Sequence, residues 1–120
     1  MSRLFPNVEW ELVTEPGGET FRIYTLGRNE DGSVWELALL QPGLYRPHVH
    51  RNTTSLIEVL EGDGVALVDE VSSEYDIGSK FEALKGVSHG FVARTDTLLL
   101  TWLSKPIKDS YTGELDLWYL

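Results

Sequence analysis

The stretch Pro47-His48-Val49-His50 contains two of the three histidines of this chain, and the third lies in Gly86-Val87-Ser88-His89-Gly90. In an extended segment, residues i and i+2 point to the same face, so His48 and His50 can bind one ion together. Imidazole is a common ligand of zinc, iron, copper and nickel. His89 is far away in the sequence and has to arrive from another strand. A closed β-structure is the simplest way to join them, so these stretches predict a fold and a metal site together.

The residues around the histidines have the pattern of short β-strands separated by turns. Residues 20–25 alternate between polar and apolar side chains, and Trp35, Leu37 and Leu39 share one face of the next run. Residues 97–103 are the most apolar run, which predicts a central strand. Because no segment has a convincing helical period, the sequence predicts an all-β sandwich or barrel.

Glycine-rich turns mark the corners of this predicted structure. Glu61-Gly62-Asp63-Gly64 separates two apolar runs, residues 56–60 and 65–68, and predicts a hairpin between them. The C-terminal segment, residues 109–120, is expected either to form a further short strand near its end or to pack across an opening of the barrel.

Length and composition favour one small protein domain over residues 1–120, because 120 residues can bury one real core. Cysteine is absent, which excludes disulfides, thiolate metal sites and cysteine nucleophiles. The N-terminus has no apolar run typical of a signal peptide, and no stretch approaches the roughly 20 apolar residues needed to cross a bilayer. We therefore expect a cytoplasmic protein without a membrane partner.

The charge of the chain narrows the range of partners. A net charge of −9 and a pI near 4.6 argue against nucleic acids and anionic membranes, because both bind clustered Lys and Arg. The acidic residues are spread along the chain and are interpreted as a solvated surface. No G-x-S-x-G, Walker A or dinucleotide motif is present. A small organic molecule is the expected partner.

At the histidines the chain resembles the cupin superfamily, small jelly-roll β-barrels with a metal site inside. The first cupin motif, here about residues 43–62, contains a glycine, His-x-His and a glutamate before a closing glycine. The second motif, here about residues 78–93, keeps its two glycines and its histidine at the expected spacing. The two motifs and their strands cover roughly residues 34–103. The resemblance implies a single-domain cupin barrel whose metal ligands are His48, His50 and His89.

The chain departs from the cupin pattern where the motif glutamate falls on Ser55. Glu58 can replace that carboxylate only if a bulge shifts the register, because it lies three residues from Ser55. Three neutral ligands leave open positions on the ion and an uncompensated 2+ charge, which favours an anionic substrate. Since some cupin dioxygenases use a three-histidine site, iron(II) is the favoured metal, with zinc, manganese and nickel as alternatives.

Other side chains are candidates for acid–base chemistry or for the lining of the cavity. Tyr24 and Glu58 are the candidate catalytic acids or bases, without a specific pattern to support either. Phe91 is the first candidate for the lining, because it shares a strand face with His89. Aromatic side chains in a small barrel more often pack than bind substrate. The predicted substrate-lining residues are Ser55, Phe91, Trp35, Trp102, Tyr45 and Arg46.

The resemblance implies a small metal-dependent enzyme that acts on a small organic molecule, and a dioxygenase-type reaction is favoured. One alternative is a redox-silent metal-dependent isomerase or lyase. Another is a non-catalytic metabolite- or sugar-binding cupin. A homodimer is expected, because many cupins dimerise and aromatic residues near the end of the chain can cover such a surface: Tyr111, Trp118 and Tyr119.

Overall fold

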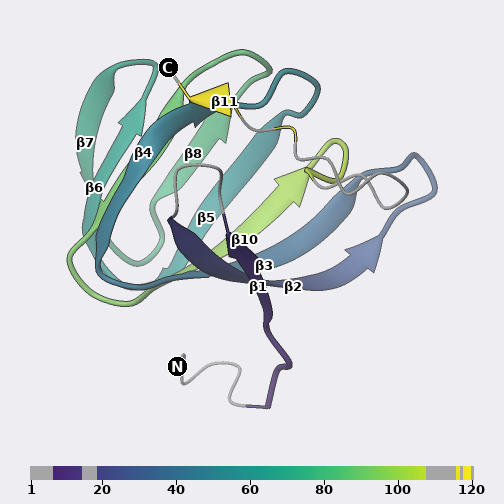
Figure 1. Ribbon diagram of the computed structural model, residues 1–120, viewed down its shortest axis with the longest axis horizontal. Coiled ribbons are helices and arrows are strands. Elements are labelled where there is room, and N and C mark those ends of the chain that lie inside the picture. Colours follow the sequence, from purple (N-terminus) through teal and green to yellow (C-terminus); the bar gives the residue numbers. More distant parts are fainter. Residues whose placement is uncertain (1–6, 15–18, 108–115, 117, 120) are drawn as a thin grey trace.

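The computed structural model describes residues 7–14, 19–107, 116 and 118–119, and every regular element among them is a β-strand (Figure 1). These residues contain no helix that is long and apolar enough to cross a membrane. The all-β prediction is confirmed. In chain order the strands are β1 (Glu11–Thr14), β2 (Thr20–Arg28), β3 (Val34–Leu40), β4 (Gly43–Val49), β5 (Ser55–Glu61), β6 (Gly64–Val68), β7 (Val71–Tyr75), β8 (Lys80–Ala83), β9 (His89–Ala93), β10 (Thr97–Leu103) and β11 (Trp118–Tyr119).

The strands form two antiparallel sheets that face each other across a common core (Figure 1). One sheet has the order β1-β2-β3-β10-β5-β8, and the other has the order β11-β4-β9-β6-β7. The chain crosses repeatedly between the sheets, as in the jelly-roll barrel that the resemblance implies. The prediction that residues 97–103 form a central strand is confirmed, because β10 pairs with β3 on one side and with β5 on the other.

Residues 61–64 do not close the predicted hairpin. β5 pairs with β10 and β8, whereas β6 pairs with β7 and β9 in the other sheet. The turn therefore carries the chain from one sheet to the other. Gly62 has a φ of 99°, and a Cβ at this position would lie 2.7 Å from Thr97 Oγ1, so the turn requires glycine. The turn residues predict a reversal of the chain but do not specify which strands pair.

The core between the sheets is built around three aromatic rings. Tyr75, Phe81 and Phe91 meet edge to face, with ring centroids 5.9 to 6.4 Å apart. The Tyr75 hydroxyl lies 2.7 Å from Thr97 Oγ1, so its polar atom is satisfied inside the core. Phe91 belongs to this core and also lines the cavity described below, so the core forms one wall of that cavity.

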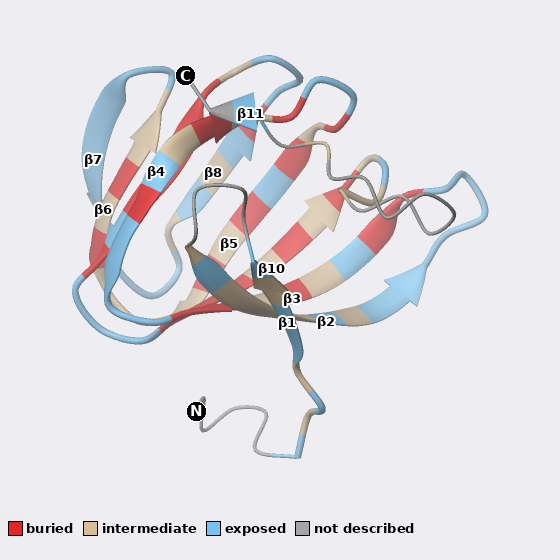
Figure 2. Cartoon of the chain, in the orientation of Figure 1, coloured by how far each residue is buried: buried red, intermediate tan, exposed pale blue. Residues whose placement is uncertain are grey.

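The outer face of the six-stranded sheet holds a second apolar cluster. Leu37, Leu39 and Leu98 are buried there, with Trp10 packed against them. Buried residues alternate with less buried ones at the start of β5 and from Leu99 to the end of β10 (Figure 2), as expected for strands with two different faces. Both faces of this sheet are therefore apolar, and hydrophobicity alone does not identify the face that lines the cavity.

Trp35 and Trp102 lie on this outer face and do not line the cavity, contrary to the prediction. They are direct cross-strand partners on β3 and β10, and Trp35 is 42% exposed. The residues of β3 that line the cavity are the alternate ones, which include Glu36 and Ala38. The sequence correctly groups Trp35 with its apolar neighbours on one face, but that face points away from the barrel interior.

Candidate metal centre

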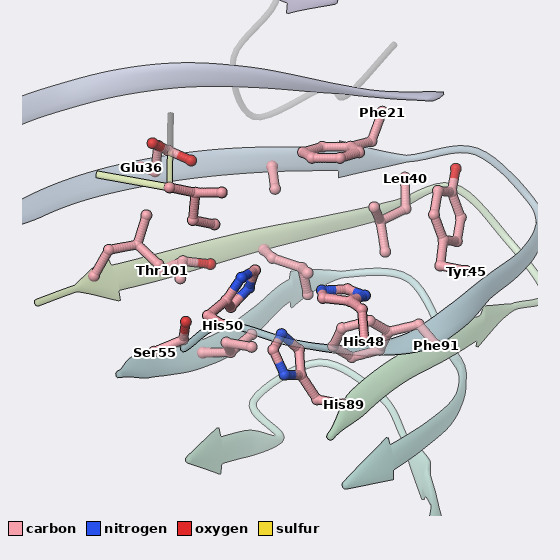
Figure 3. A pocket seen from close by; sticks show the side chains of 15 residues that line it. Phe21, Glu36, Leu40, Tyr45, His48, His50, Ser55, His89, Phe91 and Thr101 are labelled. Atoms are coloured by element: carbon pink, nitrogen blue, oxygen red, sulfur yellow. The ribbon is translucent and has the colours of Figure 1, made fainter. Parts of the chain in front are cut away.

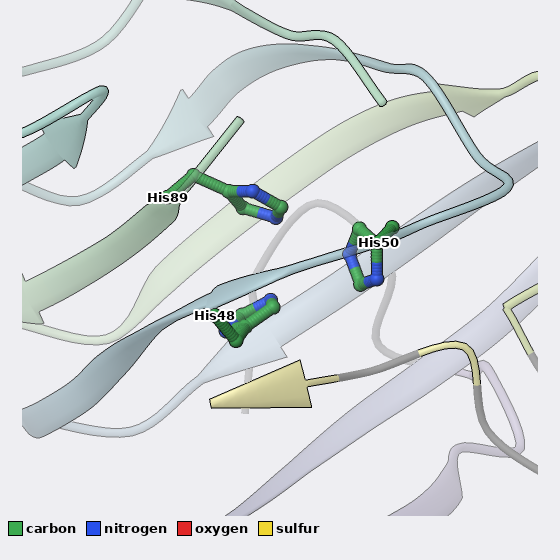
Figure 4. Close-up of side chains that lie close together, drawn as sticks. All are labelled: His48, His50 and His89. Carbon is green, nitrogen blue, oxygen red and sulfur yellow. The ribbon is translucent and has the colours of Figure 1, made fainter. Parts of the chain in front are cut away.

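The three histidines come together where β4 ends and β9 begins (Figure 4). His48 and His89 are direct cross-strand partners, and His50 follows β4 by one residue. The ring centroids are 4.4 to 5.0 Å apart. One ligand atom from each residue lies within 4.8 Å of the others. The sequence predicts that the spacing of two residues brings His48 and His50 together, and the structure confirms this. Both rings contact His89 from the neighbouring strand β9.

A bulge in β4 places both Tyr45 and His48 on the cavity side. Tyr45 pairs with Phe91 and His48 pairs with His89, so two residues of β4 lie opposite the single residue Gly90. A Cβ at Gly90 would lie 2.6 Å from the Tyr45 carbonyl oxygen, closer than real Cβ atoms approach backbone. Gly90 therefore allows the bulge, and the bulge lets an aromatic ring and a ligand three residues apart share one face.

The hydrogen bonds of the rings define which nitrogen is free for a metal. The Nδ1 atoms of His48 and His89 lie 3.1 and 3.4 Å from the backbone carbonyls of the residues two positions earlier. His50 Nδ1 contacts the carbonyl of Asp116. Because a carbonyl can only accept, Nδ1 carries the proton in each ring and Nε2 keeps its lone pair. The three Nε2 atoms are the metal-binding atoms of this arrangement.

The histidines are held in their neutral form by burial. Their exposed fractions are 8% for His48, 3% for His50 and 5% for His89. Desolvation, with a smaller contribution from the neighbouring His50, lowers the pKa of His48 to about 4. Desolvation also lowers the pKa of His50 and of His89. Neutral imidazole is the form that binds a metal ion, so the site is prepared for a cation.

Asp116 ties the C-terminal segment to the turn that follows His50. Its carboxylate accepts hydrogen bonds from the backbone N–H of Arg51 and of Asn52, both at 2.8 Å, and from Thr53 Oγ1 at 3.2 Å. Its backbone carbonyl contacts the His50 ring. A single residue thus holds both the ligand and the turn next to it. Nothing in the local pattern of residues 47–50 indicates this distant partner.

The end of the chain forms β11, which pairs with β4 beside the histidines. The short strand that was one of two alternatives for residues 109–120 is therefore confirmed. Trp118 is 45% exposed, and the Arg51 guanidinium lies 3.8 Å from the centroid of its ring. Tyr111, one of the aromatic residues expected at a dimer surface, lies outside the described residues.

The histidines open into a cavity between the two sheets (Figure 3). Of the predicted lining residues, Ser55, Tyr45 and Phe91 do line it. The Tyr45 hydroxyl accepts from the Gln41 N–H at 3.0 Å and donates to the Thr20 carbonyl at 3.3 Å, so it anchors the ring. The lining residues are Phe21, Glu36, Ala38, Leu40, Tyr45, His48, His50, Ser55, Ile57, His89, Phe91, Leu99, Thr101, Leu103 and Ile107.

Three other candidates lie away from the cavity. Arg46 sits on the bulge with its side chain exposed and forms an ion pair with Glu19 at 2.8 Å. Tyr24 is 38% exposed and is paired with Leu37, on the outer face of the sheet. Glu58 lies three positions after Ser55 in a regular strand, so it points to the opposite face, and it is not among the lining residues. Neither candidate acid or base is therefore placed beside the histidines.

Glu36 is a lining residue that the sequence analysis missed. Its side chain enters the cavity from β3, and its cross-strand partner is Thr101. Desolvation is the main cause that raises the pKa of Glu36 to about 7; the charge of Glu11 contributes to this rise, and the charge of Arg28 opposes it. The available clue is that Ala38 and Leu40 share its strand face, which is unusual for a face in contact with water.

The donor set fits a divalent transition-metal ion. Three imidazole nitrogens from buried side chains lie within 4.8 Å of one another, and a backbone carbonyl contacts the Nδ1 atom of each ring. No carboxylate or thiolate among the described residues joins the cluster, so an ion held here would have three imidazole ligands from these residues. Ser55 is buried and lines the cavity where the first motif has its glutamate. The three histidines would hold the ion, and its identity is not determined by this geometry.

Comparisons with solved structures agree with this architecture. An RmlC-like cupin from Shewanella frigidimarina has 25% identity and a TM-score of 0.65, over 79% of this chain and 83% of that chain. A predicted oxalate decarboxylase from Thermotoga maritima has 19% identity and a TM-score of 0.69, over 81% and 92%. A salicylate 1,2-dioxygenase from Pseudaminobacter salicylatoxidans has 16% identity and a TM-score of 0.63, over 70% of this chain and 26% of that chain. No protein-family model and no curated protein sequence matches the chain.

Proposed function

Because this chain has the cupin fold with three converging histidines, we propose that it is a metal-dependent enzyme acting on a small organic molecule. The observation that carries the proposal is the convergence of three neutral imidazoles at the wall of a cavity that is otherwise mostly apolar. A binding site of this kind, with few polar groups placed at one side, is the usual form of a small-molecule site.

The reaction that we favour is of the dioxygenase type with iron(II). An iron(II) ion held by His48, His50 and His89 would have only three protein ligands, and it would supply the redox chemistry that such a reaction needs. One structural neighbour is described as a salicylate 1,2-dioxygenase, which supports this choice by analogy of fold alone. The chain's own residues orient the substrate and exclude water through the apolar walls of the cavity.

A redox-silent isomerase, lyase or decarboxylase is the second candidate. It is favoured by Glu36, an acid–base group that enters the cavity from the sheet facing the histidines. Such a reaction needs a proton acceptor more than it needs oxygen, and zinc, manganese or nickel can serve as the Lewis acid. The non-catalytic metabolite- or sugar-binding cupin is the outcome that remains if no metal is bound.

A homodimer is part of the proposal. It is supported by the outer face of the six-stranded sheet, where Trp35 is 42% exposed and Leu56 is 44% exposed. Apolar side chains of this size on one sheet face favour a protein contact over water. Light scattering of the purified protein tests this, and a double substitution Trp35→Ser/Leu56→Ser is expected to give monomers.

The experiment that tests the function begins with the metal content of protein purified without an affinity tag. We expect about one equivalent of a transition metal, lost in a His48→Ala/His50→Ala variant. Oxygen consumption with iron(II), measured against zinc-loaded protein across candidate substrates, then separates the two reaction types. Negligible metal after reconstitution with iron, zinc, nickel and manganese would overturn the enzyme proposal and leave a binding protein.

A further inference from the structure

The cavity has a polar side and an apolar side. Glu36 and Thr101 are cross-strand partners, and Figure 3 shows them with Ser55 on the side of His50. The opposite side, next to His48, consists of rings and an aliphatic side chain. A molecule that fills this space therefore needs one polar end and an apolar body. The apolar side is formed by Phe21, Leu40, Tyr45 and Phe91.

Glu36 is the only acidic side chain among the described residues that line the cavity. It is partly buried, and none of the described residues forms a hydrogen bond or an ion pair with its carboxylate. A partly buried carboxylate without a partner is costly to keep in a folded protein. Glu36 lies on the polar side of the cavity, across from the histidines. A polar group of a molecule bound in the cavity can therefore be its hydrogen-bond partner.

The groups around Glu36 favour the uptake of a proton. Glu11, from β1, repels a negative charge on Glu36, and Arg28, from β2, attracts it, with desolvation as the larger influence. The histidines on the facing sheet are neutral because burial lowers their pKa values. With a pKa of about 7, the carboxylate can gain and lose a proton near neutral pH.

We propose that Glu36 accepts the proton of a hydroxyl group on the bound molecule, and that the cavity takes a compact, mostly apolar phenol or enol. In this step the O–H bond breaks, the proton moves to a carboxylate oxygen of Glu36, and the electron pair remains on the substrate oxygen. The resulting oxyanion faces the three imidazoles. This inference rests on the proposed function, because it needs a cation at the histidines to stabilise the oxyanion.

The prediction of an anionic substrate from the sequence counted only the neutral histidines; with Glu36 also lining the cavity, charge balance favours a hydroxyl compound that enters neutral and is ionised there. A carboxylate ligand entering beside an ionised Glu36 would meet a like charge in a poorly solvated space. A phenol or enol enters uncharged and becomes an anion only as Glu36 becomes neutral. The total charge of the cavity is then unchanged, and no ion has to be brought in from water.

Proton counting by calorimetry tests this step without turnover. Zinc-loaded protein is titrated with catechol at pH 8 in Hepes and in Tris, whose ionisation enthalpies differ, so that the two binding enthalpies give the protons exchanged with buffer. Zinc is redox-silent, so binding is not followed by oxidation. We expect the wild type to release close to no protons, and Glu36→Gln to release about one proton per catechol and to bind about tenfold more weakly.

Glu58→Gln is the matched control, because Glu58 lies outside the cavity lining. It is expected to behave as the wild type. Equal proton release by the wild type and Glu36→Gln would overturn the role of Glu36. Absence of catechol binding to zinc-loaded wild type would overturn the ligand class. If Glu36→Gln does not fold, Glu36→Ala replaces it in the same measurement.

The outcome is separable from that of the proposed function. Zinc content is measured on each sample before the titration, so a failure to bind metal is seen directly and contradicts the function itself. A fully loaded protein that fails the calorimetric comparison contradicts only the assignment of Glu36 and of its ligand.

Discussion

The two sheets contribute to the site in different ways. The five-stranded sheet, through β4 and β9 and the turn after β4, carries all three histidines. The six-stranded sheet faces them with the polar groups of Glu36, Thr101 and Ser55. The first sheet can hold an ion, and the second can meet the molecule bound to it. The difference suggests that metal affinity and ligand chemistry can be changed independently.

The largest expected difference between the two sheets is in metal binding. It is tested by removing one histidine from the five-stranded sheet and one hydroxyl from the six-stranded sheet. His89→Ala is expected to abolish stoichiometric metal binding, because the two remaining rings bind a divalent ion far more weakly. Ser55→Ala, on the other sheet, is expected to retain about one equivalent of metal. Elemental analysis after dialysis against a weak chelator checks both. Loss of metal in Ser55→Ala would make the facing sheet part of the metal site.

In the metal-free protein, Glu36 and the histidines change the free energy of unfolding in opposite directions as the pH rises. The pKa of Glu36 is raised from 4.5 to about 7 on folding. The stabilising contribution of Glu36 to the free energy of unfolding is therefore fully present below pH 4.5 and is lost as the pH rises through 7. The loss is up to about 3 kcal/mol of unfolding free energy. The histidines act in the opposite direction, because burial lowers the pKa of His48 to about 4.

Urea unfolding of metal-free wild type and Glu36→Gln from pH 4 to pH 8 isolates this contribution as a difference. We expect the variant to gain stability relative to the wild type above pH 5. The histidine contribution is common to both proteins and cancels. A difference that does not change with pH would show that Glu36 keeps an ordinary pKa.

Gly90→Ala tests whether the bulge in β4 is needed for stability and for metal binding. The added methyl group would collide with the Tyr45 carbonyl at 2.6 Å and with Pro47 N at 2.8 Å, both backbone atoms. We expect a loss of about 1–3 kcal/mol of unfolding free energy and weaker metal binding, because His48 and His89 flank the clash. Gly27→Ala, which has open space around its Cβ position, is the control. Equal stability of the two variants would contradict the role of Gly90.

The sequence predicted the site residues of the five-stranded sheet much better than those of the six-stranded sheet, and the reason is physical. His48 and His50 are two residues apart, so strand geometry alone brings them together, and the resemblance adds His89. Glu36 looks like a solvent-facing residue because its neighbours Trp35 and Leu37 are apolar. Since both faces of that sheet are covered by apolar groups, alternation gives the two faces but not which one is inside.

The role of Asp116 could not be predicted from the sequence, because its partners lie more than 60 positions away in the chain. Its substitution is expected to have the smallest effect of those considered. Its carboxylate caps the turn after His50, and its carbonyl orients the ring. Asp116→Ala keeps the carbonyl but removes the cap, so the turn loses three hydrogen bonds. Loss of such outer partners lowers metal affinity by about 10- to 100-fold. We expect zinc affinity, measured by competition with a chelator, to fall in that range.

Asp76→Ala is the control for Asp116→Ala, since Asp76 interacts with the exposed turn at Ser79, away from the cavity. Asp116→Asn, which keeps one acceptor oxygen, is expected to recover part of the affinity. A merely structural role would lower the unfolding free energy of the metal-free protein in proportion to the loss of affinity. A positioning role lowers the affinity more than the stability. If Asp116→Ala binds zinc as tightly as the wild type, the five-stranded sheet positions His50 without help from the end of the chain.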